Sequence, residues 1–170
     1  MIKKILLPIP LIIHLLHANS IFVPDEFQNI QDAINESDNG DSIFVSPGVY
    51  FENLNFNGKL VMLSSNYLLE NDSLLIGVTI IDAQGSGSVV TFNNGEDNNS
   101  VLQGFTLQNG AGNNEDPDDN GSFYTYGGGI YCENSNPIIK DCLIQNNTAD
   151  EGGGAGIFCF ESSPLFYGCT

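Results

Sequence analysis

Oxygen-bearing side chains gather in one short stretch, Asn113–Gly121 (NNEDPDDNG). Within it, Asp116, Asp118 and Asn120 alternate with other residues and are followed by a glycine, as in the first half of a calcium-binding loop. Carboxylate and amide oxygens suit a hard cation such as Ca²⁺. The twelfth position of such a loop normally supplies a bidentate glutamate, and here it is Gly127. The stretch predicts either a Ca²⁺ site on Asp116, Asp118 and Asn120 or an acidic loop without an ion.

Three aromatic residues, Phe123, Tyr124 and Tyr126, follow this stretch directly. Exposed aromatic rings beside a cation suit the stacking of a sugar ring. The alternative is that alternate members pack against the protein as part of a strand, with one or two exposed by chance. Both interpretations stay open at the level of sequence.

Residues typical of polysaccharide cleavage are scarce. β-Elimination needs a base near the sugar, and the chain has no arginine, while Lys140 and Lys59 fit solvated surface lysines. Hydrolysis of a glycosidic bond needs two carboxylates at a defined separation, and no acidic pair recurs in the sequence. We therefore assign no catalytic residue and no cofactor-binding residue. The sequence favours a chain that is not an enzyme and leaves a polysaccharide lyase on a uronate-containing glycan as the alternative.

The N-terminus has the pattern of a secretory signal peptide. Lys3 and Lys4 precede an apolar run from Ile5 to Leu16, and Ala18-Asn19-Ser20 offers cleavage after Ala18 or Ser20. The apolar run is too short to span a bilayer. Residues 1–20 are therefore predicted to be a signal peptide, and the protein is expected to be secreted, extracellular or at the cell surface.

Beyond the signal peptide the chain is strongly acidic. Its 21 acidic residues face only two lysines, which gives a formal charge of −19. Such a surface repels nucleic acid and anionic membranes and attracts cations. We therefore expect no nucleic-acid partner and no membrane span.

A repeat of 27 residues indicates how these side chains are positioned. The segment Gly127–Cys142 recurs as Gly154–Cys169, and Leu74–Asp82 aligns with Val101–Asn109 at the same offset. A short unit of strands and turns that recurs at a fixed period predicts one coil of a parallel β-helix. The acidic stretch interrupts this period by ten residues, so it is expected to leave the coil.

The repeat also predicts which residues stack. In a β-helix, equivalent residues of successive coils lie roughly 4.8 Å apart. The offset predicts apolar columns and a column of polar turn residues that hydrogen-bond along the axis. The predicted neighbours are Leu75 with Leu102, Val78 with Phe105, Ile80 with Leu107, Phe105 with Cys142, and Asp82 with Asn109 and Asn146.

The four cysteines fall in the same register, Cys132 with Cys159 and Cys142 with Cys169. Adjacent coils bring their Cα atoms within the range that a disulfide tolerates. The cysteines fit equally well as free thiols that serve as small core residues. The sequence leaves this choice open.

Before the repeat, residues Asp25–Glu36 place apolar side chains on one face of a helix. Short β-type runs then follow within 42–46, 49–56 and 59–64, separated by turn residues. This order predicts a helix that caps a stack of strands.

Three stretches together resemble a known family, and they cover nearly all of the chain after the signal. A capping helix and first coil are suggested by the stretch FQNIQDAINESDNGDSIFVSPGVYFENLNFNGKLVMLSS. Middle coils are suggested by TIIDAQGSGSVV with VLQGFTLQNG, and a repeat consensus by GGGIYCENSNPIIKDCLIQNNTA. The chain is similar to secreted right-handed parallel β-helix repeat proteins of the pectate-lyase-like superfamily.

The resemblance implies an all-β, right-handed parallel β-helix, a solenoid with a short N-terminal capping helix. The domain is expected to span 21–170, with the cap at about 21–41 and the coils at 42–170. Because Thr170 falls part way through a coil, we expect a chain truncated at its C-terminus.

The fold itself carries many activities. The first functional hypothesis is an exported repeat module that presents an elongated surface to a polysaccharide or a cell-surface glycan. The alternative is the N-terminal part of a polysaccharide lyase that acts on a uronate-containing glycan and has its catalytic coils further along the chain.

Overall fold

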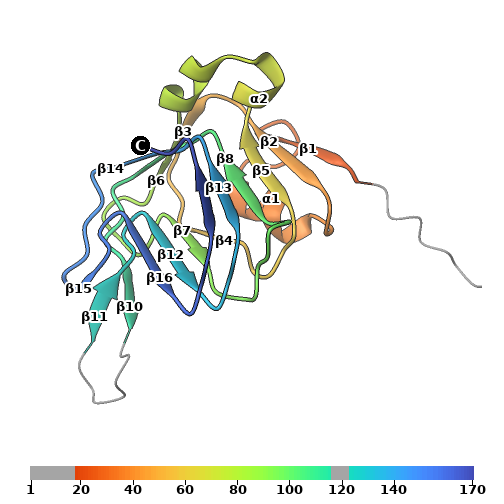
Figure 1. Ribbon diagram of the computed structural model, residues 1–170. Helices are drawn as coiled ribbons and strands as arrows, with labels where there is room; N and C mark the ends of the chain where they lie inside the picture. The colour runs from red at the N-terminus through yellow and green to blue at the C-terminus, as the bar shows by residue number, and fades with distance from the viewer. Residues whose placement is uncertain (1–17, 116–122) are drawn as a thin grey trace, which may run out of the picture.

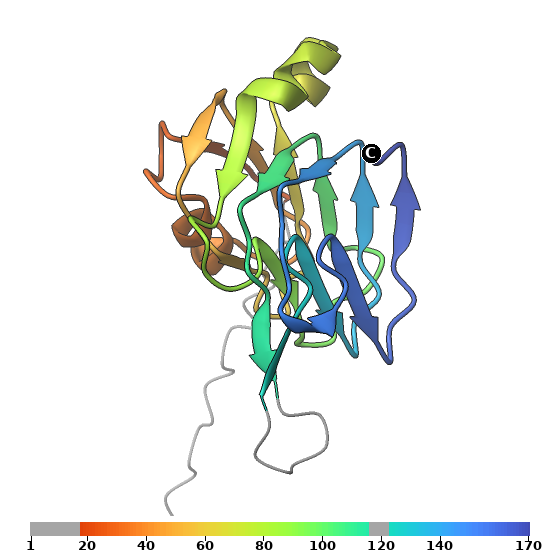
Figure 2. The same cartoon turned by 90° about the vertical axis from the view of Figure 1, so that its left-hand side faces the viewer.

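A computed structural model describes residues 18–115 and 123–170. The chain winds into a stack of coils, with α1 near one end and the C-terminal strands at the other (Figures 1 and 2). Most of the predicted signal peptide, and the candidate calcium ligands Asp116, Asp118 and Asn120, lie outside the described residues. Those two predictions therefore stay untested. The described residues contain no helix that is long and apolar enough to cross a membrane.

Three parallel sheets form the sides of the coil, which confirms the predicted all-β parallel solenoid. Sheet A contains β1 (Ser20–Val23), β2 (Ser42–Val45), β5 (Met62–Ser65), β8 (Val101–Gln103), β13 (Ile138–Lys140) and β17 (Leu165–Tyr167). Sheet B contains β3 (Gly48–Tyr50), β6 (Thr79–Asp82), β9 (Thr106–Gln108) and β14 (Leu143–Gln145). Sheet C contains β4 (Leu54–Asn55), β7 (Val90–Phe92), β12 (Ile130–Glu133) and β16 (Ile157–Phe160).

The capping helix α1 (Ile30–Glu36) covers the end of the stack and buries Ile30, Ala33 and Ile34. It begins later than the pattern of Asp25–Glu36 predicts, because Asn29 has an extended backbone. The carboxylate of Glu52 accepts the N–H groups of Ile30 and Gln31, each at 2.9 Å. It thereby satisfies two donors that every helix leaves free at its first turn.

The offset of 27 is confirmed in the C-terminal coils. Ile130 pairs with Ile157 and Cys132 with Cys159 between β12 and β16, and Lys140 pairs with Tyr167 between β13 and β17. The offset of 37 across the insertion is also confirmed, because Leu143 pairs with Thr106. The neighbouring residues Cys142 and Phe105 therefore occupy one column.

The register predicted for the middle coils is wrong. Ile81, not Ile80, pairs with Leu107, and Leu63, not Leu75, lies beside Leu102. The segment that contains Leu75 and Val78 is the 3₁₀-helix η1 (Ser73–Val78), which follows the short helix α2 (Tyr67–Glu70). These helices form an excursion between sheet A and sheet B that an unbroken strand pattern does not reveal (Figure 1).

Columns of inward-facing side chains fill the coil. Phe56, which directly follows β4, and Phe92 of β7 lie in successive coils with ring centroids 4.4 Å apart, and both are fully buried. Ile43, Leu63, Leu102 and Ile139 form the equivalent column of sheet A. Each coil thus adds apolar surface to one continuous core.

The ten-residue insertion leaves the coil as predicted. Its described parts are β10 (Asn113–Glu115) and β11 (Tyr124–Tyr126), which pair in antiparallel fashion, while β11 also pairs in parallel with β15 (Glu151–Gly153). Figure 2 shows this hairpin pointing away from the stacked coils. The hairpin is the one antiparallel pairing among the described strands, and its base lies next to sheet C.

Candidate functional site

The base of the hairpin packs against sheet C. Asn113 and Glu115 lie opposite Tyr126 and Tyr124, so these four side chains share one face of the hairpin. The side-chain amide of Asn113 donates to Thr91 Oγ1 of β7 at 3.1 Å. The ring of Tyr126 packs on that of Phe158 in β16, with centroids 4.6 Å apart. A corner therefore forms between the hairpin and the sheet.

A row of aromatic rings lies at this corner, with Tyr126 and Phe158 half-buried and Tyr131 buried. Tyr131 and Phe158 are register partners on β12 and β16, and their rings stack at 5.7 Å with an interplanar angle of 25°. Phe158 thus lies between Tyr126 and Tyr131. Two residues further along the same strands, Glu133 lies beside Phe160, which is 50% exposed. We call Glu115, Tyr126, Tyr131, Glu133 and Phe158 the aromatic corner.

Two carboxylates flank the phenol of Tyr131. The Tyr131 hydroxyl donates to Glu133 Oε2 at 3.1 Å, and Glu115 of the hairpin lies near enough to influence the pKa of the same hydroxyl. Burial and the charge of Glu133 raise the pKa of Glu115 above its ordinary value. Burial, together with both carboxylates, raises the pKa of Tyr131. The corner therefore holds acceptor groups next to apolar rings, which suits recognition of hydroxyl groups on an apolar ring.

The three aromatic residues that the sequence singled out differ in their exposure to solvent. Phe123 is exposed, while Tyr124 and Tyr126 are half-buried on the face turned toward sheet C. The candidate ligands Asp116, Asp118 and Asn120 belong to the connection between β10 and β11, outside the described residues. Within residues 18–115 and 123–170, no group of three or more His, Cys, Asp or Glu side chains is placed to hold a metal ion.

Sequence reasoning missed the roles of Glu115, Tyr131, Glu133 and Phe158. The repeat does align Tyr131 with Phe158, so it contains the signal that these two rings stack. The approach of Glu115 and Tyr126 depends on the hairpin, and the repeat carries no information on how an insertion folds back.

A second polar cluster lies on sheet A. The Tyr67 hydroxyl donates to Asp141 Oδ2 at 3.0 Å, and Lys140 Nζ lies 3.9 Å from the same oxygen. Burial and the hydrogen bond to Asp141 raise the pKa of Tyr67. A cavity of about 310 Å³ lies beside Asp141 and is lined in part by Ser73 and Ile76 of η1. The lysine predicted to be solvated thus takes part in a weak surface ion pair.

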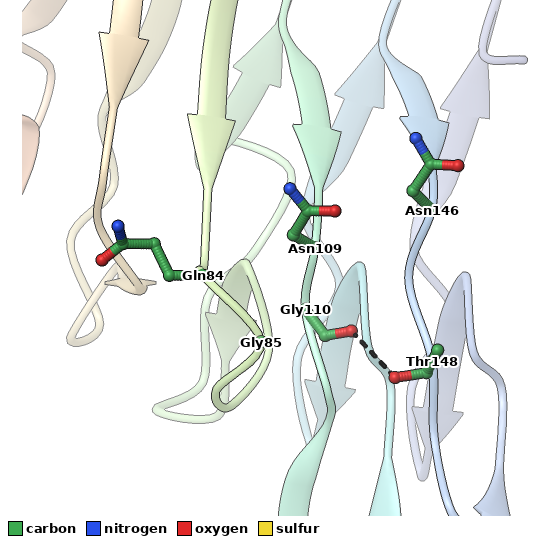
Figure 3. Close-up of a pocket in the computed structure, with 6 residues that line it drawn as sticks. All are labelled: Gln84, Gly85, Asn109, Gly110, Asn146 and Thr148. Carbon is green, nitrogen blue, oxygen red and sulfur yellow. Dashed lines mark hydrogen bonds between the residues drawn. The ribbon is translucent and has the colours of Figure 1, made fainter.

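A third feature is a groove along the turns that follow sheet B, shown in Figure 3. Gln84, Asn109 and Asn146 contribute one amide side chain from each of three coils, and all three have left-handed backbones. The groove holds about 310 Å³, and the Thr148 hydroxyl donates across it to the Gly110 carbonyl at 3.4 Å. The groove is open and is not an enclosed pocket.

An amide ladder stabilises the strands next to this groove. Asp82 pairs with Gln108, not with Asn109 as the repeat predicts, because the offset here is 26 and not 27. Gln145 Nε2 donates to Gln108 Oε1 at 3.2 Å, and Gln108 Nε2 donates to Asp82 Oδ2 at 2.9 Å. The Asn109 amide also donates to Asp82 Oδ2, at 2.8 Å, so the predicted contact along the axis exists one residue out of register.

Asp82 is expected to make stability depend on pH. Burial raises its pKa, but hydrogen bonds from Gln108, the Gln84 N–H and Asn109 outweigh that effect, so the net pKa lies below its ordinary value. Because the pKa is lower in the folded state, the ionised Asp82 stabilises the fold at pH values above its unfolded pKa of about 3.9. This contribution is lost as the pH falls through the folded pKa. Asp82→Asn should cost about 1–2 kcal/mol at pH 7 and much less at pH 3.

Urea unfolding of both proteins at the two pH values checks this expectation. Asp25→Asn is the matched control, because Asp25 is exposed. An Asp82→Asn effect of equal size at pH 7 and pH 3 would show that the lost stability is unrelated to the charge of Asp82.

Comparison with known proteins supports the architecture. No family model matches the sequence, and no curated protein matches it. The fold is similar to a crystal structure of a pectin methylesterase mutant in complex with hexasaccharide IV, with a TM-score of 0.56 and 16% identity over 90% of this chain and 48% of that chain. The chain has a parallel β-helix fold like that of this solved structure.

A second solved structure of this fold, a pectin methylesterase in complex with hexasaccharide VII, matches with a TM-score of 0.51. It shares 15% identity over 77% of this chain and 44% of that chain. The chain thus spans about half the length of these solved structures. At this level of identity the likeness establishes the β-helix fold and leaves activity to be argued from the site.

Proposed function

We propose that this protein is an exported β-helix repeat module that binds carbohydrate, and that the aromatic corner is its contact site. The observation that supports it is the pair of half-buried rings Tyr126 and Phe158, which pack with the buried Tyr131 between the carboxylates of Glu115 and Glu133. Aromatic rings pack against the C–H faces of sugars, and carboxylates accept hydrogen bonds from their hydroxyl groups. An elongated solenoid places such a site on a surface that runs along several coils.

The negative charge of the protein favours an uncharged glycan over a polyanionic one as the ligand. A formal charge of −17 for the whole chain, with two glutamates in the corner itself, disfavours a polyanionic glycan. The fold neighbours are pectin methylesterases in complex with hexasaccharides. We therefore propose a neutral or methyl-esterified, pectin-like oligosaccharide as the ligand. Ca²⁺ on Asp116, Asp118 and Asn120 remains a proposal, and repeating the titration with a chelator tests whether an ion contributes.

Replacing Phe158 with alanine is expected to weaken oligosaccharide binding about tenfold or more, because it removes the central ring of the stack. Isothermal titration with a methyl-esterified pectin hexasaccharide measures the change. Phe51→Ala is the matched control, since Phe51 is 62% exposed and lies outside the corner.

Glu133→Gln provides a second arm of the same titration. It keeps the shape of the side chain and removes its charge, so it should weaken binding less than Phe158→Ala does. Unchanged affinity in Phe158→Ala, with the fold intact by circular dichroism, would exclude the aromatic corner as the binding site.

Export is proposed together with cleavage after Ala18. The Asn19 N–H donates to Asp41 Oδ1 at 2.7 Å, and the Asn19 carbonyl accepts from the Ser42 N–H at 2.9 Å. Cleavage after Ser20 would remove these contacts and the first residue of β1. N-terminal sequencing of the exported protein should therefore begin at Asn19, and a start at Ile21 would contradict this assignment.

A second candidate function is the N-terminal part of a polysaccharide lyase. The observation that favours it is the cluster of Lys140, Asp141 and Tyr67, in which Asp141 lines a cavity and Lys140 lies 3.9 Å from its carboxylate. A base and a cation near a uronate are what β-elimination needs. Release of unsaturated uronate products from pectin, with loss of that release in Lys140→Met, would favour this candidate over a binding module.

A further inference from the structure

Two pairs of cysteines lie across the boundary between the last two coils of the described chain. Cys132 and Cys159 are register partners on the parallel strands β12 and β16. Cys142 and Cys169 follow the paired strands β13 and β17, and the Thr170 N–H donates to the Cys142 carbonyl at 3.0 Å. The thiols of each pair are close enough for one to shift the pKa of the other. Neighbouring parallel strands are roughly 4.8 Å apart, which falls inside the Cα separation of a disulfide.

Each cysteine column has a phenylalanine below it. Cys132 pairs with Phe92 on the side away from Cys159, and Phe92 is fully buried. The Leu143 N–H donates to the Phe105 carbonyl at 2.9 Å, which places Cys142 beside Phe105 in the same way. Within the described columns, a buried cysteine therefore has a single cysteine neighbour, in the next coil. The geometry favours pairing between coils over pairing within one coil.

The members of each pair differ in access to solvent. Cys132 and Cys142 are buried, whereas Cys159 is exposed and Cys169 is intermediate. The hydrogen bond from Cys132 lowers the pKa of Cys159, and the hydrogen bond from Cys142 lowers that of Cys169. The accessible thiol of each pair is thus the one that ionises first, and a thiolate is the nucleophile in disulfide exchange.

We propose that Cys132–Cys159 and Cys142–Cys169 are two disulfide-forming pairs that staple successive coils together. With a small-molecule disulfide as the oxidant, the thiolate of Cys159 attacks one sulfur and releases one small-molecule thiolate, which leaves a mixed disulfide on Cys159. The thiol of Cys132 then loses its proton to solvent and attacks the Cys159 sulfur. This step forms the protein disulfide and releases the second small-molecule thiolate. Two protein thiols are oxidised and one disulfide is reduced. Cys169 and Cys142 react in the same order.

The staples would join the last described coil to the coil before it. Ile157 and Phe166 continue the apolar columns into the last described coil, and Phe166 is 37% exposed there. A cavity of about 350 Å³ opens among Ile144, Ile157 and Phe166 at this edge. Each disulfide would close a loop of 27 residues and hold this coil on the preceding one. Oxidation should therefore raise the melting temperature by roughly 5–10 °C for each bond.

Oxidation of the purified, folded protein with oxidised glutathione tests the proposal. After the free thiols are blocked, cleavage at glutamate separates the four cysteines onto four peptides, because a glutamate lies between each successive pair. Mass spectrometry should find the two pairings between coils, and little of any other. The same oxidation in denaturant is the control, since it allows all three pairings of four cysteines.

Two variants separate pairing from folding. Cys159→Ser should leave Cys132 free for alkylation and keep the Cys142–Cys169 bond, while Cys169→Ser should do the reverse. Both variants keep the buried cysteine in the core, so they should fold. Four alkylated thiols after oxidation of the folded protein would overturn the proposal, as would stable glutathione adducts without protein disulfides or a bond between Cys159 and Cys169.

Discussion

Replacing Glu96 with alanine is expected to lower the free energy of unfolding by about 3–5 kcal/mol. Glu96 is 1% exposed and connects three coils. Its carboxylate accepts the Gly58 N–H at 2.8 Å, the Asn94 N–H at 2.9 Å and the Ser135 hydroxyl at 2.8 Å. Alanine would leave these three donors without their acceptor and would leave a cavity between coils.

Urea unfolding measures this change, and two further variants define its origin. Glu96→Gln keeps the volume and one acceptor oxygen, so it should fall between the wild type and Glu96→Ala. Glu70→Ala makes the same truncation at an exposed position of α2 and should change the stability by less than about 0.5 kcal/mol. A Glu96→Ala variant as stable as Glu70→Ala would mean that the buried carboxylate does not hold the coils together.

Gly128→Ala is expected to destabilise the fold by about 3 kcal/mol. A Cβ atom at Gly128 would overlap the Thr148 carbonyl oxygen and would lie 2.6 Å from the Ala155 carbonyl oxygen. Both obstacles are backbone atoms of the next coil, and Ala155 accepts the Gly129 N–H at 3.0 Å. The clash can be relieved only by moving one coil away from the other, which weakens the hydrogen bonds between them.

Gly153→Ala is the matched control for this substitution. A Cβ atom at Gly153 meets nothing within 4 Å. Thermal unfolding should therefore show a large decrease for Gly128→Ala and little change for Gly153→Ala. Equal melting temperatures for the two variants would show that the close approach of the coils at Gly128 is not required for stability.

The sequence predicted the C-terminal coils well because the repeat there is direct. Cys132 and Cys159 share identity and register, and no insertion separates their coils. The register of the middle coils was harder to predict, because apolar residues of η1 such as Leu75 align with strand residues of the next coil. Their helical turn depends on the preceding α2, and a local pattern of apolar residues does not distinguish the two structures.

The candidate site was only partly predictable for a similar reason. The acidic insertion stood out because it broke the period, and the structure places aromatic residues and carboxylates at its base. The approach of Glu115 to Tyr131 depends on the antiparallel pairing of β10 with β11, which sets the base of the hairpin beside sheet C. Such contacts follow from tertiary packing, which a repeat pattern does not encode.

The central claim is that the aromatic corner binds a pectin-like oligosaccharide. An amide NMR titration of the isotope-labelled protein with a methyl-esterified pectin hexasaccharide tests it most directly, because the spectrum reports on every face at once. The expected result is saturable shifts concentrated on β11, β12 and β16, around Tyr126, Tyr131 and Phe158. Shifts confined to sheet A around Tyr67 and Asp141, or none at saturating oligosaccharide, would contradict it.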